Sequence, residues 1–147
     1  MPILKEKMKV DYHAIPHAVF SYPEIAGVGM GEQKTIEKYG KDKVVIGLKF
    51  FEDTAKGRAM EIKDYFVKVI LYEDEENILG AYIIGSHASI LIHQIIPLMY
   101  TESRSTEPIM RGMDIPPSLS EVVTRAFYSR MSLEHYHHFL KNIGLED

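Results

Sequence analysis

The sequence predicts an α+β fold in which helices pack on a mainly antiparallel sheet. Segments with the composition of strands are grouped in the first part of the chain, and segments with helical periodicity are grouped in the second part. Two strand-like segments, 65–72 and 78–84, flank an acidic turn of hairpin length, which indicates an antiparallel pair. Because strands and helices do not alternate along the chain, a parallel α/β sheet is not expected.

The chain of 147 residues has the size of a single domain. We expect an N-terminal arm over residues 1–14, a domain over 15–131 and a C-terminal helical extension over 132–147. The composition is 46% hydrophobic and 26% charged, which is typical of a globular protein with a sizeable core.

Two further segments are expected to form strands. Segment 18–22 ends at Pro23, which predicts an edge strand because proline cannot continue a ladder of hydrogen bonds. Segment 43–51 is rich in β-branched and aromatic residues and places alternate side chains on one face. These side chains are Val44, Ile46, Leu48 and Phe50. Gly80, inside segment 78–84, predicts a bulge or a close approach of two backbones.

Helices are expected in the remaining segments. The stretch "EQKTIEKYGKD" is rich in helix formers, and Gly40 lies where a C-cap is preferred. Residues 87–101 predict one helix that is apolar on most sides, with Pro97 kinking it or marking its last turns. The other predicted helices are 107–112, 119–131 and 133–143, the last with Ser132 as its N-cap.

Composition also excludes several classes of function. The net charge of −4 argues against nucleic acid as a partner, since binding a polyanion requires a basic surface. The apolar stretch 88–100 is too short and too polar to span a bilayer, and the N-terminus lacks a secretory signal, so we expect a cytoplasmic protein with no membrane partner. The chain has no cysteine, which excludes disulfides, thiolate metal sites and a thiol nucleophile.

The glycines of "GVGMG" and the histidines do not predict a site. Gly27, Gly29 and Gly31 lack the G-x-G-x-x-G spacing of a nucleotide loop, so a turn or a closely packed strand is favoured. His135 and His138 are three residues apart on a predicted helix without a nearby third ligand. A solvated helix face is favoured over a metal site, and no metal is expected.

The stretch "MDIPPSLSEVV", residues 113–123, has two readings. Ser118 and Glu121 form the S-x-x-E pattern of a capping box at the start of a helix, in which the serine hydroxyl and the glutamate each accept a backbone N–H. This structural role is favoured for Glu121, although a catalytic role is weighed below.

Several stretches, taken together and in order, resemble a known family. They are "IPHAVFSYPEIAGVG", "GRAM", "DYFVKVI", "ILGAYIIGSHASILIHQI" and "IPPSLSEVV". The chain resembles, from about residue 15 to 127, the C-terminal interface domain of the FAD-dependent pyridine nucleotide-disulfide oxidoreductases, such as dihydrolipoamide dehydrogenase and mercuric reductase. The resemblance implies a two-fold dimerisation domain.

The same resemblance implies roles for individual residues. The family has His-Pro-Thr-x-Ser-Glu where this chain has "PPSLSE", and the His and Glu form a proton-shuttling dyad that serves the partner subunit's thiols. Glu121 matches the dyad glutamate, whereas Pro116 falls on the histidine and has no proton to transfer. Pro116 and Pro117 are implied to lie near the partner's flavin, and we predict a cis peptide bond between them.

The resemblance leads to two hypotheses about function. In the first, the chain is the dimerisation domain of an FAD- and NAD(P)-dependent oxidoreductase, as a fragment without the FAD and NAD(P) domains and the redox-active cysteines. It would then bind no cofactor alone. In the second, it is a stand-alone, non-catalytic homodimeric binding or scaffold module. Either form is expected to be a homodimer, because helix 87–101 is too apolar to be covered by one sheet face. The expected interface residues are Ile92, Ile96, Ile115 and Leu119.

Overall fold

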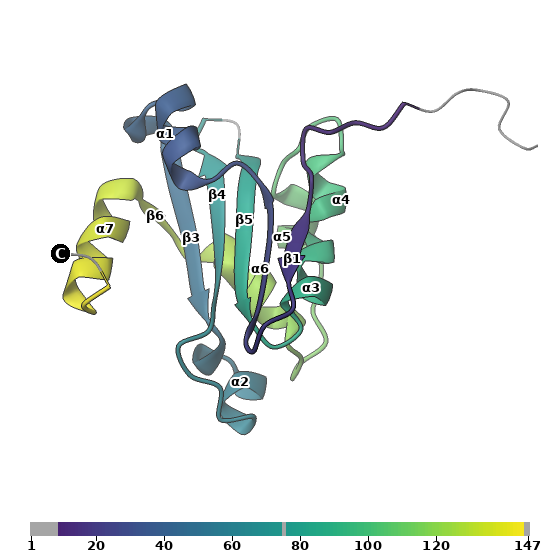
Figure 1. Ribbon diagram of the computed structural model, residues 1–147, viewed down its shortest axis with the longest axis vertical. Helices are drawn as coiled ribbons and strands as arrows, with labels where there is room; N and C mark the ends of the chain where they lie inside the picture. The colour runs from purple at the N-terminus through teal and green to yellow at the C-terminus, as the bar shows by residue number, and fades with distance from the viewer. Residues whose placement is uncertain (1–8, 75, 146–147) are drawn as a thin grey trace, which may run out of the picture.

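The computed structural model describes residues 9–74 and 76–145, in which six strands form one antiparallel sheet (Figure 1). The strands are β1 (His17–Val19), β2 (Glu24–Gly29), β3 (Val44–Phe50), β4 (Phe66–Tyr72), β5 (Asn77–Gly85) and β6 (Arg130–Ser132). Their order across the sheet is β1-β2-β5-β4-β3-β6. The predicted α+β class and antiparallel sheet are therefore confirmed.

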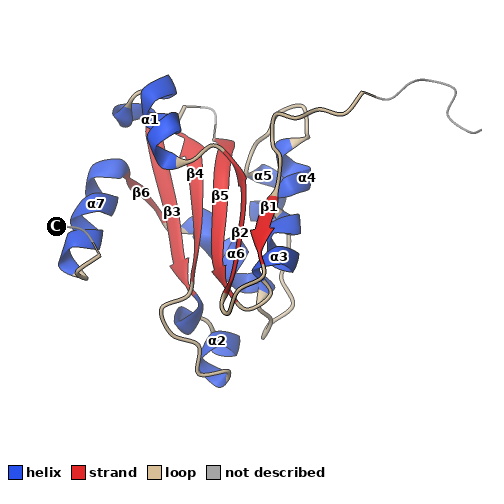
Figure 2. Ribbon diagram, viewed as in Figure 1, coloured by secondary structure: helices blue, strands red, loops and turns tan. Residues whose placement is uncertain are grey.

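The helices are short and cover both faces of this sheet (Figure 2). They are α1 (Glu32–Tyr39), α2 (Ala55–Ala59), α3 (Ala88–Leu91), α4 (Ile96–Met99), α5 (Glu107–Arg111), α6 (Ser120–Tyr128) and α7 (Leu133–Asn142), with 3-10 turns η1 (Lys41–Lys43), η2 (Phe51–Asp53) and η3 (Ile92–Gln94). Gly40 ends α1 with a φ of 83°, as the C-cap prediction required.

The glycines of β2 and β5 allow backbones to approach closely. A Cβ on Gly80 would lie 2.1 Å from the carbonyl oxygen of Met30, and the β4–β5 register shifts between Ile70 and Leu71. A Cβ on Gly27 would lie 2.8 Å from the rings of His17 and Tyr82. The predicted bulge and the predicted close packing of the "GVGMG" segment are both confirmed.

Two hydrophobic clusters lie on opposite faces of the sheet. On one face α3, α4 and α6 pack against alternate residues of the strands, including Val67, Val69 and Ile83. On the other face α7 packs near Val44, Ile46, Leu48 and Ile70, with Ile36 and Tyr39 of α1 at the margin. Those three β3 residues share one face, as the alternation predicted.

The single helix predicted over 87–101 is wrong, because the structure divides it into α3, η3 and α4. Pro97 explains the division. Its ring clashes with the carbonyl four residues earlier, and it has no N–H for the helical hydrogen bond to that carbonyl, which belongs to His93 in η3. The chain therefore tightens into a 3-10 turn at this point.

The helix predicted over 119–131 ends earlier, and its last residues form a strand instead. β6 pairs with β3 through only Val45 to Gly47. Arg130 fixes this short strand, because its Nε donates to the Phe127 carbonyl at 2.7 Å and its Nη1 lies 2.9 Å from a Glu76 carboxylate oxygen. The hydrogen bond from Arg130 is the main reason that the pKa of Glu76 is lowered.

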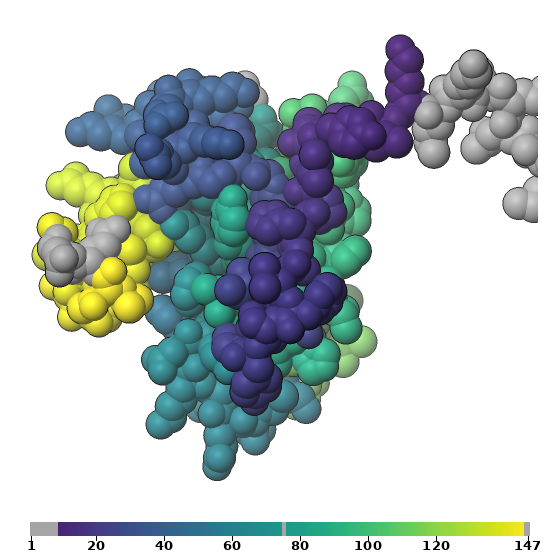
Figure 3. Space-filling model, viewed as in Figure 1, coloured from purple at the N-terminus to yellow at the C-terminus, as the bar shows by residue number. Residues whose placement is uncertain are grey.

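Residues 9–12 are exposed, and the chain from residue 13 onward contacts the domain (Figure 3). The predicted arm is described from residue 9 onward, where Ala14 is fully buried and the His13 ring nitrogen Nε2 lies 2.8 Å from the Met99 carbonyl oxygen. At the other end, the Ser132 hydroxyl accepts a hydrogen bond from the His135 N–H at 3.2 Å, which confirms the predicted N-cap of α7.

Candidate functional site

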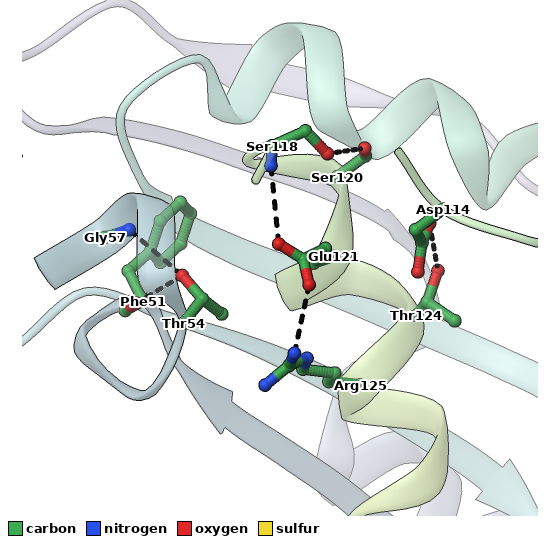
Figure 4. Close-up of polar contacts among 9 residues, drawn as sticks. All are labelled: Phe51, Thr54, Gly57, Asp114, Ser118, Ser120, Glu121, Thr124 and Arg125. Carbon is green, nitrogen blue, oxygen red and sulfur yellow. Dashed lines mark hydrogen bonds and ion pairs between the residues drawn. The ribbon is translucent and has the colours of Figure 1, made fainter. Parts of the chain in front are cut away.

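The segment between α5 and α6 presents an exposed loop at one end of a buried helix (Figure 4). Ile115 is 81% exposed, and Pro116 and Pro117 are also exposed. The Pro116–Pro117 peptide bond is cis, as predicted. Pro116, which the resemblance matches to the dyad histidine, is thus solvent-accessible, and a proline can make contacts but cannot exchange a proton.

Glu121 lies in the first turn of α6 and is buried, with its side chain 8% exposed. One carboxylate oxygen accepts the Ser118 backbone N–H at 3.3 Å, and the other accepts the Arg125 guanidinium at 3.0 Å. Both oxygens are therefore engaged by groups of the same segment. This arrangement stabilises the start of the helix.

The predicted capping box is only half formed. Glu121 accepts the Ser118 N–H as predicted, but the Ser118 hydroxyl lies 2.6 Å from the Ser120 hydroxyl instead of accepting a backbone N–H of α6. The nearby start of α2 shows the half that is missing at α6, since the Thr54 hydroxyl accepts the Gly57 N–H at 3.0 Å (Figure 4). A competing hydroxyl two residues away explains the difference at Ser118.

Two hydrogen bonds from α6 hold the loop in place. The Thr124 hydroxyl donates to an Asp114 carboxylate oxygen at 3.1 Å, and the Tyr128 hydroxyl donates to the Met110 carbonyl. Neither contact was predicted, because Asp114 and Tyr128 have no local sequence pattern that marks them as partners. The loop shape consequently depends on α6, which is itself buried in the core.

The four predicted interface residues are not equivalent. Ile115 is strongly exposed, and Leu119 and Ile96 are half-buried at the margin of the core. Ile92 is 2% exposed and packs inside the core, so it is not on a surface that a partner can reach. Ile90, two residues earlier, is 65% exposed instead. Because segment 87–101 is apolar on most sides, its sequence did not distinguish buried from exposed residues.

The histidines are the remaining candidates for a metal site. Among the residues that the structure describes, no group of three or more His, Cys, Asp or Glu could hold a metal ion. His135 and His138 are exposed on α7, as a solvated helix face predicts, and His93 lies 2.9 Å from the Ser89 carbonyl. No helix within residues 9–74 and 76–145 is long and apolar enough to cross a membrane.

A known protein family matches most of the chain. Residues 15–127 match the family described as pyridine nucleotide-disulphide oxidoreductase, dimerisation domain. The chain belongs to this family. The match includes the loop and most of α6 and ends at Phe127, so that β6 and α7 lie beyond it. The predicted relationship to the dimerisation domain is confirmed.

Curated relatives of this dimerisation domain include several reductases and dehydrogenases. The chain is 35% identical over 127 residues to dihydrolipoyl dehydrogenase from Synechocystis sp., covering 85% of this chain and 27% of that protein. It is 36% identical over 116 residues to mycothione reductase from Mycobacterium tuberculosis, covering 79% of this chain and 25% of that protein. The chain thus spans about a quarter of the length of these relatives.

Solved structures show the same fold. The HOCl-induced flavoprotein disulfide reductase RclA from Escherichia coli matches with a TM-score of 0.74 and 21% identity, over 86% of this chain and 29% of that chain. LpdA from Mycobacterium tuberculosis matches with a TM-score of 0.70 and 22% identity, over 82% of this chain and 26% of that chain. At these identities the likeness concerns the fold alone.

Proposed function

We propose that this dimerisation domain forms a homodimer and belongs to an FAD- and NAD(P)-dependent oxidoreductase resembling dihydrolipoamide dehydrogenase. In the proposed enzyme, residues 115–121 lie beside the partner subunit's active site. The family match and the relatives named above support this proposal, and the exposed loop supplies a surface for it. Location in the cytoplasm stays a prediction.

The mechanistic part of this proposal depends on Pro116 and Glu121. Pro116 has no titratable group, and both oxygens of Glu121 are engaged by Ser118 and Arg125. A general base must reach the proton that it takes up. Pro116 has no basic group, and the Glu121 carboxylate is buried. The loop would therefore position the partner's site without moving protons, and Glu121 would act as a structural residue. Turnover of a dithiol substrate by the usual acid–base step is accordingly not expected.

The residues of this chain fit a contact with a flavin better than a flavin-binding site of their own. The close packing around Gly27 and Gly80 leaves no room for a phosphate at these glycines. Pro116 and Pro117 are exposed and would lie against a flavin held by another part of the enzyme. When bound, the flavin supplies the acceptor for hydride from the nicotinamide.

A stand-alone homodimeric module is the second candidate function. The proline at the dyad position favours it, because the proton-shuttling role of the dyad is then lost. The two candidates differ in what the loop contacts, since only the first requires a flavin beside Pro116. In an intact oxidoreductase, activity with a quinone acceptor but little with dihydrolipoamide would support the first candidate. Absence of any bound flavin from the full natural protein would support the second.

The homodimer is tested by sedimentation velocity of the purified chain at micromolar concentration. We expect a dimer for the natural chain and a dimer at least about tenfold weaker for Ile115→Asp, because burying an unpaired carboxylate is costly. Val19→Asp is the matched control and should leave the dimer intact. Val19 is 54% exposed and lies on the sheet face opposite to α6. A natural chain that sediments only as a monomer would contradict the proposal.

A further inference from the structure

Helices α6 and α7 cover opposite faces of β3, but they are attached very differently. Six of the nine residues of α6 are buried, whereas in α7 only Leu133 and Tyr136 of ten residues are buried. Phe139 and Leu140 are half-buried beside them. Elements with few buried apolar contacts are the first to open in native proteins, so α7 is expected to release before α6.

The polar contacts of α7 also allow it to leave the domain without leaving a buried charge unpaired. The Glu32 carboxylate binds the Lys68 ammonium through one oxygen and lies 3.0 Å from His137 Nε2 through the other. The Lys68 ammonium also lies 4.4 Å from the centre of the Tyr136 ring. If α7 leaves, Lys68 and Glu32 keep each other as partners. The large penalty of an uncompensated buried ion is therefore avoided.

An apolar surface lies beneath α7 and continues beyond it. Val44, Ile46, Leu48 and Ile70 form the buried floor under the helix. The strand register then continues this face as a row across the sheet. The row runs through Phe50, Phe66, Ile84, Ile25 and Val19.

Exposure rises along this row away from α7. Phe50, Phe66 and Ile84 are half-buried, and exposure reaches 38% at Ile25 and 54% at Val19. In Figure 3, α7 forms a ridge at one side of this face. Release of α7 would thus join its floor to the open row in one continuous apolar surface, which is the kind of surface that marks interaction sites.

We propose that α7 is a releasable cover over a docking surface for an amphipathic helix of a partner protein. The seated α7 defines the chemistry of that partner. It presents Leu133, Tyr136 and Phe139 at a spacing of three residues, so a competing helix needs large apolar or aromatic side chains along one stripe. This surface lies on the sheet face opposite to α6 and the loop of residues 115–117, and the proposal does not depend on the proposed redox function.

Hydrogen exchange of the intact chain tests the release. We expect the amides of α7 to exchange on the order of 100-fold faster than those of α6, since only α7 opens without global unfolding. Equal protection of the two helices would overturn the proposal, because α7 would then open only when the whole domain unfolds.

A synthetic peptide of residues 133–145 tests the docking surface, with the full chain as the receptor. Because the apparent affinity scales with the fraction of released chain, Tyr136→Ala in the receptor should raise peptide affinity by about tenfold. His138→Ala, on the exposed side of the same helix, is the matched control and should leave affinity unchanged.

A second variant guards against misfolding of Tyr136→Ala. His137→Ala removes the contact with Glu32 and leaves the apolar stripe in place, so a smaller gain in peptide affinity is expected. Unchanged protection of α6 would show that each variant is folded. If α7 exchanges rapidly in a folded variant and the peptide still fails to bind, the docking surface is refuted.

Discussion

Helices α6 and α7 both begin near a serine, but they are held in place differently. One has the helix cap that its sequence predicts, and the other has more buried side chains. At α7 the Ser132 hydroxyl caps the helix as its sequence predicts, yet only two side chains of the helix are buried. At α6 the Ser118 hydroxyl is diverted to Ser120, yet six residues are buried. A local start signal therefore says little about how firmly a helix is attached, which depends on the apolar area that it buries.

Truncating one large side chain in α6 and one in α7 should give the largest difference in stability. Phe127 of α6 is fully buried, so Phe127→Ala should lower the free energy of unfolding by about 4 kcal/mol through lost burial and a cavity. Tyr136→Ala should cost only about 1–2 kcal/mol, because the loss is limited by the free energy that holds α7 on the domain.

Chemical denaturation with fluorescence or circular dichroism measures both values. The slope of the transition should stay the same for Phe127→Ala, which keeps the two-state comparison valid. Equal costs for the two variants would mean that α7 is as integral to the fold as α6.

Removing the hydroxyl groups of Thr54 and Ser118 should give a smaller difference in stability. Thr54→Ala removes a fully buried cap that accepts the Gly57 N–H and should cost about 1–2 kcal/mol. Ser118→Ala removes a hydroxyl bonded only to another hydroxyl and should change stability by less than about 0.5 kcal/mol. Thermal unfolding of both variants checks the difference. A cost at Ser118 similar to that at Thr54 would indicate that its hydroxyl does cap α6 in solution.

The central strands could be predicted from sequence because their signals are local. Alternation in segment 43–51, the hairpin spacing before β5 and the glycine after α1 each depend on a few adjacent residues. β6 could not be predicted in this way, since its three residues become a strand only by pairing with β3, some eighty residues earlier. The division at η3 was accessible in principle, because Pro97 acts on the carbonyl of His93.

The candidate site was predictable only in part, for a similar reason. The S-x-x-E spacing correctly predicted that Glu121 reaches back to the Ser118 N–H. The contact of Arg125 with the other oxygen is a local i, i+4 pair within α6. The hydrogen bond from Thr124 to Asp114 could not be predicted in this way, because it depends on which face of α6 meets the loop. The significance of Pro116 came from resemblance to a family, since a proline before a helix is otherwise unremarkable.

The smallest expected effect concerns a charged contact on the α6 side of the sheet. Glu24 of β2 accepts the Ser89 N–H at 3.0 Å and the Ser89 hydroxyl at 2.8 Å, which ties α3 to the sheet. The backbone hydrogen bond from Ser89 is the main reason that the pKa of Glu24 is lowered from its ordinary value of 4.5. A group whose pKa is lower in the folded state contributes stability above its unfolded pKa and loses it as pH falls through the folded value.

Glu24→Gln should therefore destabilise the domain slightly at neutral pH and not at all at the acidic end of the titration. Thermal unfolding between pH 7 and about pH 3 measures this convergence, which arises because the protonated glutamate and the glutamine are then both neutral. Glu102→Gln, at an exposed carboxylate in the loop after α4, is the matched control and should follow the natural chain at every pH. Curves for Glu24→Gln that stay parallel to the natural chain would mean that the charge of Glu24 does not stabilise the attachment of α3. The attachment would then depend on the apolar contacts of Ala88 and Leu91.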